Sequence, residues 1–212
     1  MPPYKDRSLT NNFTSDQLDW ARKCVDLTNL NVPYDNTNNY YKYFDELVYL
    51  PEKLSIINFL KLRDTKNLKI LDIGTGVGHL LVLSKNLGHS VVGTETKDSI
   101  NFLSNIYSFY ELDIRELTIE KQQSFYLDDK FDLITICRSV FDYNEKLENT
   151  WTAQDWRFLK DNIFNYLNNN GRFFIKTNIK HARFPTAIKE IENAFGERIS
   201  GWNSISYLFT KL

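Results

Sequence analysis

Residues 70–78 read ILDIGTGVG, an apolar run that ends in three glycines at alternate positions. The chain has 212 residues and only 8 Gly, so three of them within five positions mark an unusual stretch of backbone. Glycine has no Cβ and adopts left-handed conformations that other residues avoid. The stretch therefore indicates either a tight turn between two elements or a bare backbone surface on which a large, flat ligand rests.

Short apolar runs alternate with helical patterns along the rest of the chain. Strand patterns occupy residues 68–73, 89–95, 108–114, 130–140 and 172–179, of which 108–114 is the weakest. The first is a continuous apolar run, typical of a strand buried on both faces of a sheet. Helical patterns of about ten residues lie between or after them, at residues 79–88, 98–107, 156–167 and 185–195. Such crossovers join strands into a mostly parallel sheet with helices on both faces. The sequence therefore predicts a doubly wound α/β fold.

The two ends of the chain add to this fold. The residues before the first strand are mostly helical in pattern, at 15–27, 40–50 and 51–62. Pro51 suits the first turn of the last of these helices. Residues 198–212 have the pattern of two strands joined around Asn203 and Ser204. This pair indicates an antiparallel last strand at or near one edge of the sheet.

The composition is that of a globular protein, with 42% hydrophobic and 25% charged residues. The formal net charge of −1 argues against a nucleic-acid partner, which normally requires a basic surplus. Cys24 and Cys137 are too few for a disulfide framework or a cysteine metal cluster, and no metal is expected. The first residues lack the apolar core of a signal peptide, and no stretch approaches the roughly 20 apolar residues of a membrane span. We therefore expect a cytoplasmic protein with no membrane partner.

Spacing distinguishes kinds of nucleotide site at the glycine turn. A dinucleotide fingerprint of the form GxGxxG requires a small residue at position 79, where this chain has His79. A P-loop requires Lys followed by Ser or Thr after the last glycine, and the sequence HLLVLSK follows Gly78 instead. The turn therefore favours neither of these two sites.

Two acids follow at positions that bear on a nucleoside. Glu95 ends the next apolar run, 21 residues after Gly74, near the place where a carboxylate accepts hydrogen bonds from ribose hydroxyls. The alternative for Glu95 is a solvated charge at the end of a strand. Asp113 lies near the end of the third run, and its carboxylate either accepts a hydrogen bond from an adenine amino group or caps a helix.

At these residues the sequence resembles the class I S-adenosylmethionine-dependent methyltransferases. The resemblance rests on ILDIGTGVG, on Glu95 and on the later runs FDLITIC and LNNNGRFFIK. More narrowly, residues 40–60 and 151–178 are similar to a bacterial subgroup of small methyltransferases. The resemblance implies a seven-stranded Rossmann-like sheet with an antiparallel C-terminal strand. It also implies an N-terminal helical extension or lid at 1–66 and an S-adenosylmethionine-binding domain at 67–212.

The resemblance assigns roles to individual residues of the donor site. Asp72 is expected to orient the glycine turn or to reach the donor's amino group through water. The donor's amino-acid part is expected to lie against Gly74, Thr75, Gly76 and Gly78. Glu95 is expected to hold the ribose and Asp113 the adenine edge. A hydroxyl from the helical extension, that of Tyr40 or Tyr43, is expected at the donor carboxylate.

The acceptor side gives weaker signals, because methyl transfer from a sulfonium depends mainly on alignment and on exclusion of water. Arg138 either pairs with an anionic substrate or forms a surface salt bridge, and Asn178 is a polar substrate contact or a loop cap. A general base is needed only for an acceptor that arrives protonated. The catalytic residue is unassigned, and the candidates are Asp142 and His181.

Three functions remain open on the sequence alone. The first is methyl transfer from S-adenosylmethionine to a small-molecule or saccharide-like acceptor, by a monomer or homodimer. The second is a binding protein that keeps the donor pocket without transfer. The third, disfavoured by His79, is a nicotinamide-dependent oxidoreductase.

Overall fold

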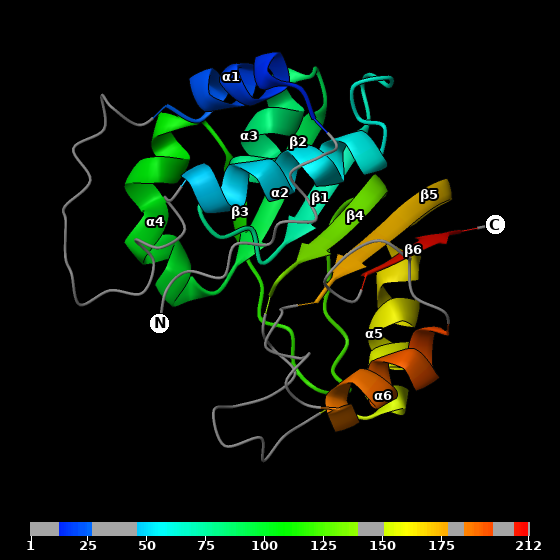
Figure 1. Cartoon of the computed structure of the whole chain (residues 1–212). Coiled ribbons are helices and arrows are strands. Elements are labelled where there is room, and N and C mark those ends of the chain that lie inside the picture. The colour runs from blue at the N-terminus through cyan, green and yellow to red at the C-terminus, as the bar shows by residue number, and fades with distance from the viewer. Residues whose placement is uncertain (1–12, 27–45, 140–150, 178–184, 197–205, 212) are drawn as a thin grey trace.

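The computed structural model describes residues 13–26, 46–139, 151–177, 185–196 and 206–211 (Figure 1). One sheet lies at its centre, with the strand order β3-β2-β1-β4-β5-β6. The strands are β1 (Lys69–Ile73), β2 (Ser90–Glu95), β3 (Asp113–Glu116), β4 (Phe131–Cys137), β5 (Leu167–Lys176) and β6 (Ser206–Thr210). The helices are α1 (Ser15–Cys24), α2 (Glu46–Phe59), α3 (His79–Asn86), α4 (Lys97–Phe109), α5 (Ala153–Asn165) and α6 (Pro185–Phe195).

The sheet is mostly parallel. Strands β1 to β5 pair in parallel, and β6 pairs antiparallel with β5. The predicted α/β architecture with an antiparallel C-terminal strand is therefore confirmed. The described residues form six strands rather than the expected seven. Of the strand pair expected around Asn203 and Ser204, only β6 is described, because residues 197–205 lie outside the described part.

The order in which strands are added to the sheet reverses between β3 and β4. After β1 the sheet extends through β2 to β3, and the chain then returns to add β4, β5 and β6 on the other side of β1. The neighbouring strands β1 and β4 are therefore followed by crossovers that lead away from each other. Open α/β sheets bind ligands at such a switch point, outside the carboxyl ends of the strands.

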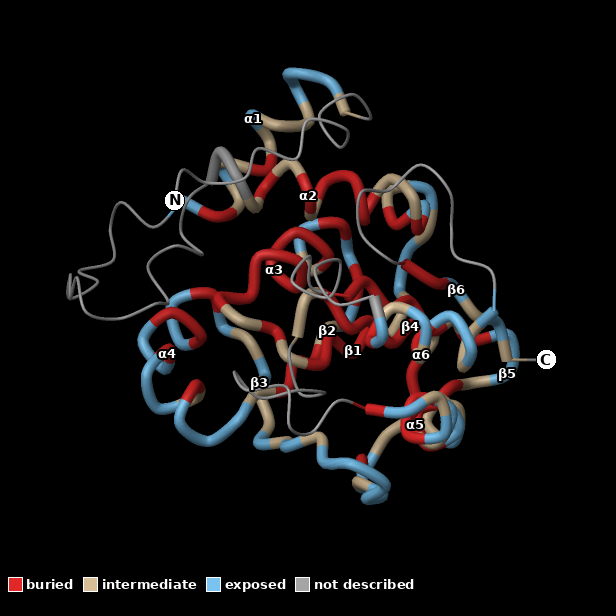
Figure 2. The backbone as a smooth tube through the Cα atoms, turned by 60° about the horizontal axis from the view of Figure 1, so that its bottom comes forward, coloured by how far each residue is buried: buried red, intermediate tan, exposed pale blue. Residues whose placement is uncertain are grey.

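Successive strand residues point to opposite faces of the sheet, so the central strands contribute to two cores. On one face, helices α1 to α4 pack against side chains that include Ile70 and Leu133. On the other face, helices α5 and α6 pack against Leu71, Ile134 and Phe173. Figure 2 shows buried residues concentrated in β1, β4 and α3. Burial on both faces explains why these strands read as continuous apolar runs.

Two element boundaries differ from the prediction. Helix α2 runs without a break through Pro51, where two helices were expected. Leu50 and Leu54 on either side of the proline are fully buried in the same core, and this packing keeps the helix continuous. Helix α4 ends at Phe109 and β3 begins only at Asp113, so the third strand starts later than predicted.

Helix α2 belongs to the core on the face of the sheet that α1 to α4 cover. Leu54 and Ile57 share one cluster of buried side chains with Ile70 of β1 and Phe174 of β5. The boundary predicted after residue 66 stays a prediction, because packing alone does not divide the chain there. Among the described residues, no helix has both the length and the apolar composition that a bilayer span requires.

Candidate functional site

A cavity of about 510 Å³ opens at the carboxyl ends of β1, β2 and β4. Five segments line it: helix α2, the glycine turn, the end of β2 with the start of α4, the chain after β3, and the chain after β4. The cavity therefore lies at the switch point of the sheet, where the fold predicts a ligand. Its volume falls within the range of small-molecule sites.

The three glycines of the turn have left-handed backbone angles, with φ of 71°, 58° and 86° for Gly74, Gly76 and Gly78. Their surroundings differ. A Cβ on Gly74 would lie 2.0 Å from the Oγ of Ser139, and a Cβ on Gly78 would lie 2.6 Å from the Cδ1 of Leu112. A Cβ on Gly76 would meet nothing within 4 Å. The bare backbone expected for a ligand is therefore found at Gly76, whereas protein side chains fill the space beside the other two glycines.

Hydrogen bonds hold the turn in place. The amides of Gly74 and Thr75 both donate to the carbonyl oxygen of Thr94, at 2.9 and 3.1 Å. The Thr75 hydroxyl donates to the carbonyl oxygen of Asp72 at 2.8 Å. Gly74, Thr75 and Gly76 line the cavity. Gly78 lies behind this lining, as the N-cap of α3.

The predicted acid of the second strand reaches the glycine turn. Glu95 lines the cavity, and its Oε1 accepts a 2.7 Å hydrogen bond from the amide of Gly76. Its Oε2 accepts a hydrogen bond from the amide of Thr96, the N-cap of α4. The Tyr107 hydroxyl of α4 donates to the carbonyl oxygen of Gly76 at 2.7 Å. Both polar groups of the Gly76 backbone are thus held by side chains, and Tyr107 is a contact that the sequence analysis missed.

Asp72 lies in the sheet beneath the turn. It is 2% exposed, and its Oδ1 accepts a 2.6 Å hydrogen bond from the hydroxyl of Thr135 in β4. Burial raises the pKa of Asp72 to about 6, against the opposing effects of the Lys53 charge and the Thr135 hydrogen bond. Its main-chain carbonyl supports the turn, but its side chain does not line the cavity.

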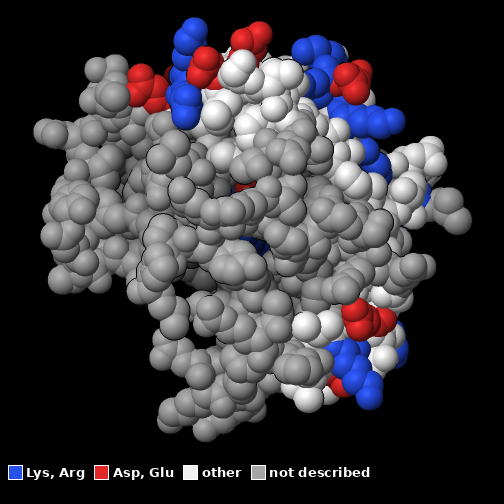
Figure 3. All heavy atoms as spheres, viewed as in Figure 1, with Lys and Arg blue, Asp and Glu red and all other residues white. Residues whose placement is uncertain are grey.

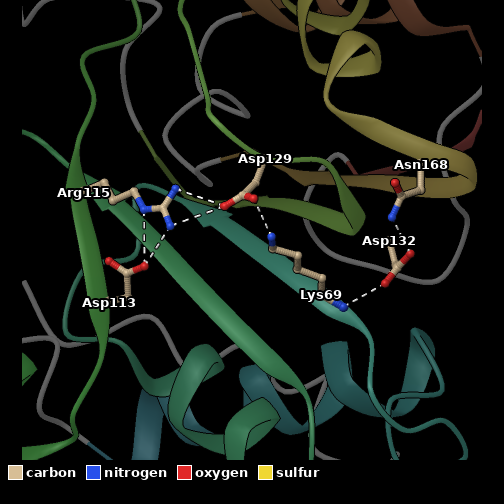
Figure 4. A network of polar contacts seen from close by, with 6 residues as sticks. All are labelled: Lys69, Asp113, Arg115, Asp129, Asp132 and Asn168. Carbon is tan, nitrogen blue, oxygen red and sulfur yellow. Dashed lines mark hydrogen bonds and ion pairs between the residues drawn. The ribbon is translucent and has the colours of Figure 1, made fainter.

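The structure places Asp113 outside the lining of the cavity. Asp113 is the first residue of β3 and pairs with Val92, whereas the carboxyl end of β3 is Glu116, which pairs with Glu95. The exposed Asp113 carboxylate accepts a 2.9 Å hydrogen bond from Arg115 and belongs to a polar network that continues through Asp129 (Figure 4). Late initiation of β3 therefore removes Asp113 from the cavity. The lining after β3 comes from Leu117, Thr118 and Ile119.

Helix α2 contributes two lining residues that the sequence analysis missed, Tyr49 and Lys53. They are four residues apart, a spacing that places them on one face of a helix and was the available signal. Lys53 places a positive charge near the turn. This charge partly opposes the rise in the pKa of Asp72 and adds to the fall in the pKa of His79. Burial is the main cause that lowers the pKa of His79 to about 4, so this lining residue is neutral at pH 7.

Arg138 lines the cavity directly after β4. It has a left-handed backbone conformation with φ of 62°, and its amide donates to the carbonyl oxygen of Lys176 at 2.7 Å. Its guanidinium forms an ion pair with Glu52 of α2, which is 2% exposed. Its contacts therefore differ from the surface salt bridge that the sequence left open. Next to it, the Ser139 hydroxyl donates to the carbonyl oxygen of Ile73.

Five predicted site residues lie outside the described residues: Tyr40, Tyr43, Asp142, Asn178 and His181. Their expected roles at the donor carboxylate, in the acceptor pocket and in catalysis remain predictions.

Comparison with known proteins adds a family to this geometry. A family model described as "Methyltransferase domain" matches residues 64–210. The chain is also 36% identical over 140 residues to ribosomal RNA small subunit methyltransferase G of Malacoplasma penetrans (strain HF-2). That alignment covers 60% of this chain and 54% of the relative, so the chain spans about half the length of the curated relative it matches.

Solved structures share the fold at low sequence identity. A ribosomal protein L11 methylase from Lactobacillus delbrueckii subsp. bulgaricus has a TM-score of 0.50 and 18% identity, over 76% of this chain and 80% of that one. DesVI of Streptomyces venezuelae has a TM-score of 0.50 and 14% identity, over 68% of this chain and 58% of that one. These two likenesses concern the architecture.

Proposed function

The chain belongs to the methyltransferase domain family, and we propose that the whole protein uses S-adenosylmethionine to methylate ribosomal RNA. The family match confirms the class I S-adenosylmethionine-dependent methyltransferases that the sequence resembles. Within the structure, the observation that carries the proposal is the contact between Glu95 and Gly76 at the open backbone of the cavity.

The cavity residues fit the nucleoside part of the donor. Glu95 offers a carboxylate at the end of β2, where an acid accepts hydrogen bonds from ribose hydroxyls. Leu117 and Ile119 supply apolar lining against which an adenine ring would pack. The backbone at Gly76 leaves space for a ligand close to the Glu95 carboxylate. We therefore assign the ribose to Glu95 and the adenine to residues 117–119, in place of Asp113.

The glycine turn and α2 fit the amino-acid part of the donor. Gly74, Thr75 and Gly76 line the cavity with main chain, and Lys53 adds a positive charge near this turn. Opposite charges attract strongly in a partly buried site. We assign Lys53 to the donor carboxylate. His79 is neutral at pH 7 because of its lowered pKa, so it would contribute hydrogen bonds but no charge.

When bound, S-adenosylmethionine supplies a methyl group on a positively charged sulfur. The protein's own residues have to align the acceptor and exclude water. The Cys137 thiol lines the cavity, and burial raises its pKa to about 12. It therefore stays protonated at pH 7 and is a poor competitor for the methyl group, because the thiolate is the reactive form of cysteine.

The acceptor is proposed from the relative in Malacoplasma penetrans, whose name gives ribosomal RNA as its substrate. This relative overturns the prediction that the charge balance argues against nucleic acid. Net charge is a property of the whole chain, whereas RNA contact requires only a suitable local surface. On the face shown in Figure 3, the described Lys and Arg side chains are interspersed with Asp and Glu side chains.

The experiment follows labelled methyl groups from S-adenosylmethionine into two fractions of cells that lack the gene: small ribosomal subunits and low-mass metabolites. We expect the label in the RNA of the small subunits, from which ribonuclease treatment should release it. Label confined to the low-mass fraction would replace RNA with the small-molecule acceptor that the sequence predicts. Label in neither fraction, from a protein that binds S-adenosylhomocysteine, would favour a binding protein without transfer.

A further inference from the structure

A carboxylate of helix α2 is buried beside the cavity without lining it. Glu52 is 2% exposed, and its Oε1 lies 3.3 Å from the Nζ of Lys176 at the end of β5. Its Oε2 forms an ion pair with the guanidinium of Arg138, directly after β4. Glu52 therefore connects α2 to the carboxyl ends of two neighbouring strands.

This buried cluster of charges is a poor source of stability. Lys176 is fully buried, and burial lowers its pKa despite the opposing attraction of Glu52. Buried ion pairs can often be replaced by apolar residues without loss of stability. Arg138 also has a left-handed backbone conformation, which is costly for a residue other than glycine and is found preferentially at functional sites. Both features indicate a role in the adjacent cavity.

Glu52 lies between the residues through which α2 lines the cavity. Tyr49 comes three positions before it and Lys53 directly after it. Arg138, its partner, lies over the Tyr49 ring, with 5.9 Å between the guanidinium carbon and the ring centroid. A shift of α2 relative to β4 and β5 would therefore move Tyr49 and Lys53 relative to the glycine turn.

We propose that Glu52 is a positioning residue for the methyl donor: its ion pairs with Arg138 and Lys176 hold α2 so that Tyr49 and Lys53 reach the donor's amino-acid part. The inference rests on the proposed donor and is independent of the acceptor. The nucleoside part is assigned to Glu95 and residues 117–119, which belong to other elements. Loss of the Glu52 charge should therefore affect one part of the donor and spare the other.

Two ligands report separately on the amino-acid part and the nucleoside part of the donor. S-adenosylhomocysteine carries the amino-acid part, and 5′-methylthioadenosine keeps the nucleoside but lacks it. Calorimetry gives both dissociation constants for the full-length wild type and for Glu52→Gln, which keeps the shape of the side chain. We expect Glu52→Gln to weaken the binding of S-adenosylhomocysteine by about tenfold or more. Binding of 5′-methylthioadenosine should change by less than about twofold.

Two further variants complete the comparison. Glu52→Asp keeps the charge on a shorter side chain, and we expect a selective loss smaller than that of Glu52→Gln, about threefold. Glu190→Gln is the matched control, because Glu190 is a carboxylate of α6 that accepts a hydrogen bond from the amide of Ala153, on the far layer of the protein. It should leave both affinities unchanged.

A double-mutant cycle tests whether Glu52 acts through Lys53. If it does, the loss of S-adenosylhomocysteine affinity in Glu52→Gln combined with Lys53→Gln should be smaller than the sum of the two single losses. Additive losses would show that the two residues act independently and would contradict the proposed route.

Each remaining result decides the inference. Equal weakening of both ligands, or no weakening of either, in folded Glu52→Gln would overturn it. If circular dichroism shows that Glu52→Gln does not fold, the same comparison in Glu52→Asp decides in the same way. A wild type that binds neither ligand would refute the proposed donor instead, so the two failures are distinguishable.

Discussion

The amide of Gly76 donates a 2.7 Å hydrogen bond to the carboxylate of Glu95, across 19 positions of sequence. Gly76 belongs to the turn after β1, and Glu95 ends β2. The contact joins the two strongest signals in the sequence at one point of the cavity. It also lies where the backbone is open to a ligand, and the proposed donor site is built on this pair.

Replacement of Glu95 should weaken donor binding. In Glu95→Ala the ribose hydroxyls would lose their partner, and we expect a loss of about 1–3 kcal/mol in affinity for S-adenosylhomocysteine. Calorimetric titration measures it. Glu116→Ala is the control, because Glu116 is the exposed neighbour of Glu95 in β3 and lies outside the cavity lining. An unchanged affinity in Glu95→Ala would remove Glu95 from the site.

Gly74 should matter for packing. In Gly74→Ala the new methyl would overlap the Ser139 side chain, whose Cβ lies only 2.8 Å from the Cβ position. Together with the left-handed backbone, this should cost about 1–3 kcal/mol of stability in denaturant unfolding. Ser139→Gly in the same chain should restore part of the loss. A double variant as unstable as Gly74→Ala would contradict the overlap.

The ionised Asp72 side chain should destabilise the fold at neutral pH. Burial raises its pKa to about 6 from 3.8, so between these values the folded protein binds more protons here than the unfolded chain. This group therefore makes stability fall as pH rises through that window. Asp72→Asn should raise stability at pH 7.5 by about 1–3 kcal/mol and leave it little changed near pH 4. The amide oxygen can still accept from Thr135.

His79 contributes to the pH dependence of stability with the opposite sign, and this provides an internal check on the Asp72 prediction. Its pKa is lowered from 6.5 to about 4, so its stabilising contribution is present above pH 6.5 and is lost as pH falls through 4. The two slopes oppose each other in the wild type. Urea unfolding of Asp72→Asn at pH 4.5 and 7.5 should show stability that rises more steeply with pH than in the wild type. An equal pH dependence of stability in the two proteins would show that the pKa of Asp72 is not raised.

Asp113 should be dispensable for binding of the donor. Its side chain is 54% exposed and pairs with Arg115, which also bonds to Asp129. We expect Asp113→Ala to leave the affinity for S-adenosylhomocysteine unchanged and to cost less than about 1 kcal/mol of stability, as exposed ion pairs contribute little. A tenfold loss of affinity would return Asp113 to the site.

The sheet could be predicted wherever its strands are buried on both faces. β1 and β4 are continuous apolar runs, and the long helices between strands imply the parallel order. β3 was misplaced because its four residues, DIRE, are exposed or half-buried at the edge of the sheet, so no apolar run marks them. The continuity of α2 through Pro51 depends on packing against the sheet, which local propensity does not contain.

The lining of the cavity was predictable where local chemistry defines it. Gly76 and Glu95 follow from the glycine spacing and the offset to the next strand end. Tyr49 and Lys53 were missed because their place depends on how α2 docks on the sheet. The need for glycine at position 74 also comes from far away in sequence, since Ser139 fills the space beside it.

The most direct measurement is a crystal structure of the protein with S-adenosylhomocysteine. The ribose hydroxyls should lie within hydrogen-bonding distance of the Glu95 carboxylate, with the adenine against Leu117 and Ile119. A cavity that stays empty under saturating ligand, or a ligand whose sugar lies away from Glu95, would contradict the proposed donor site.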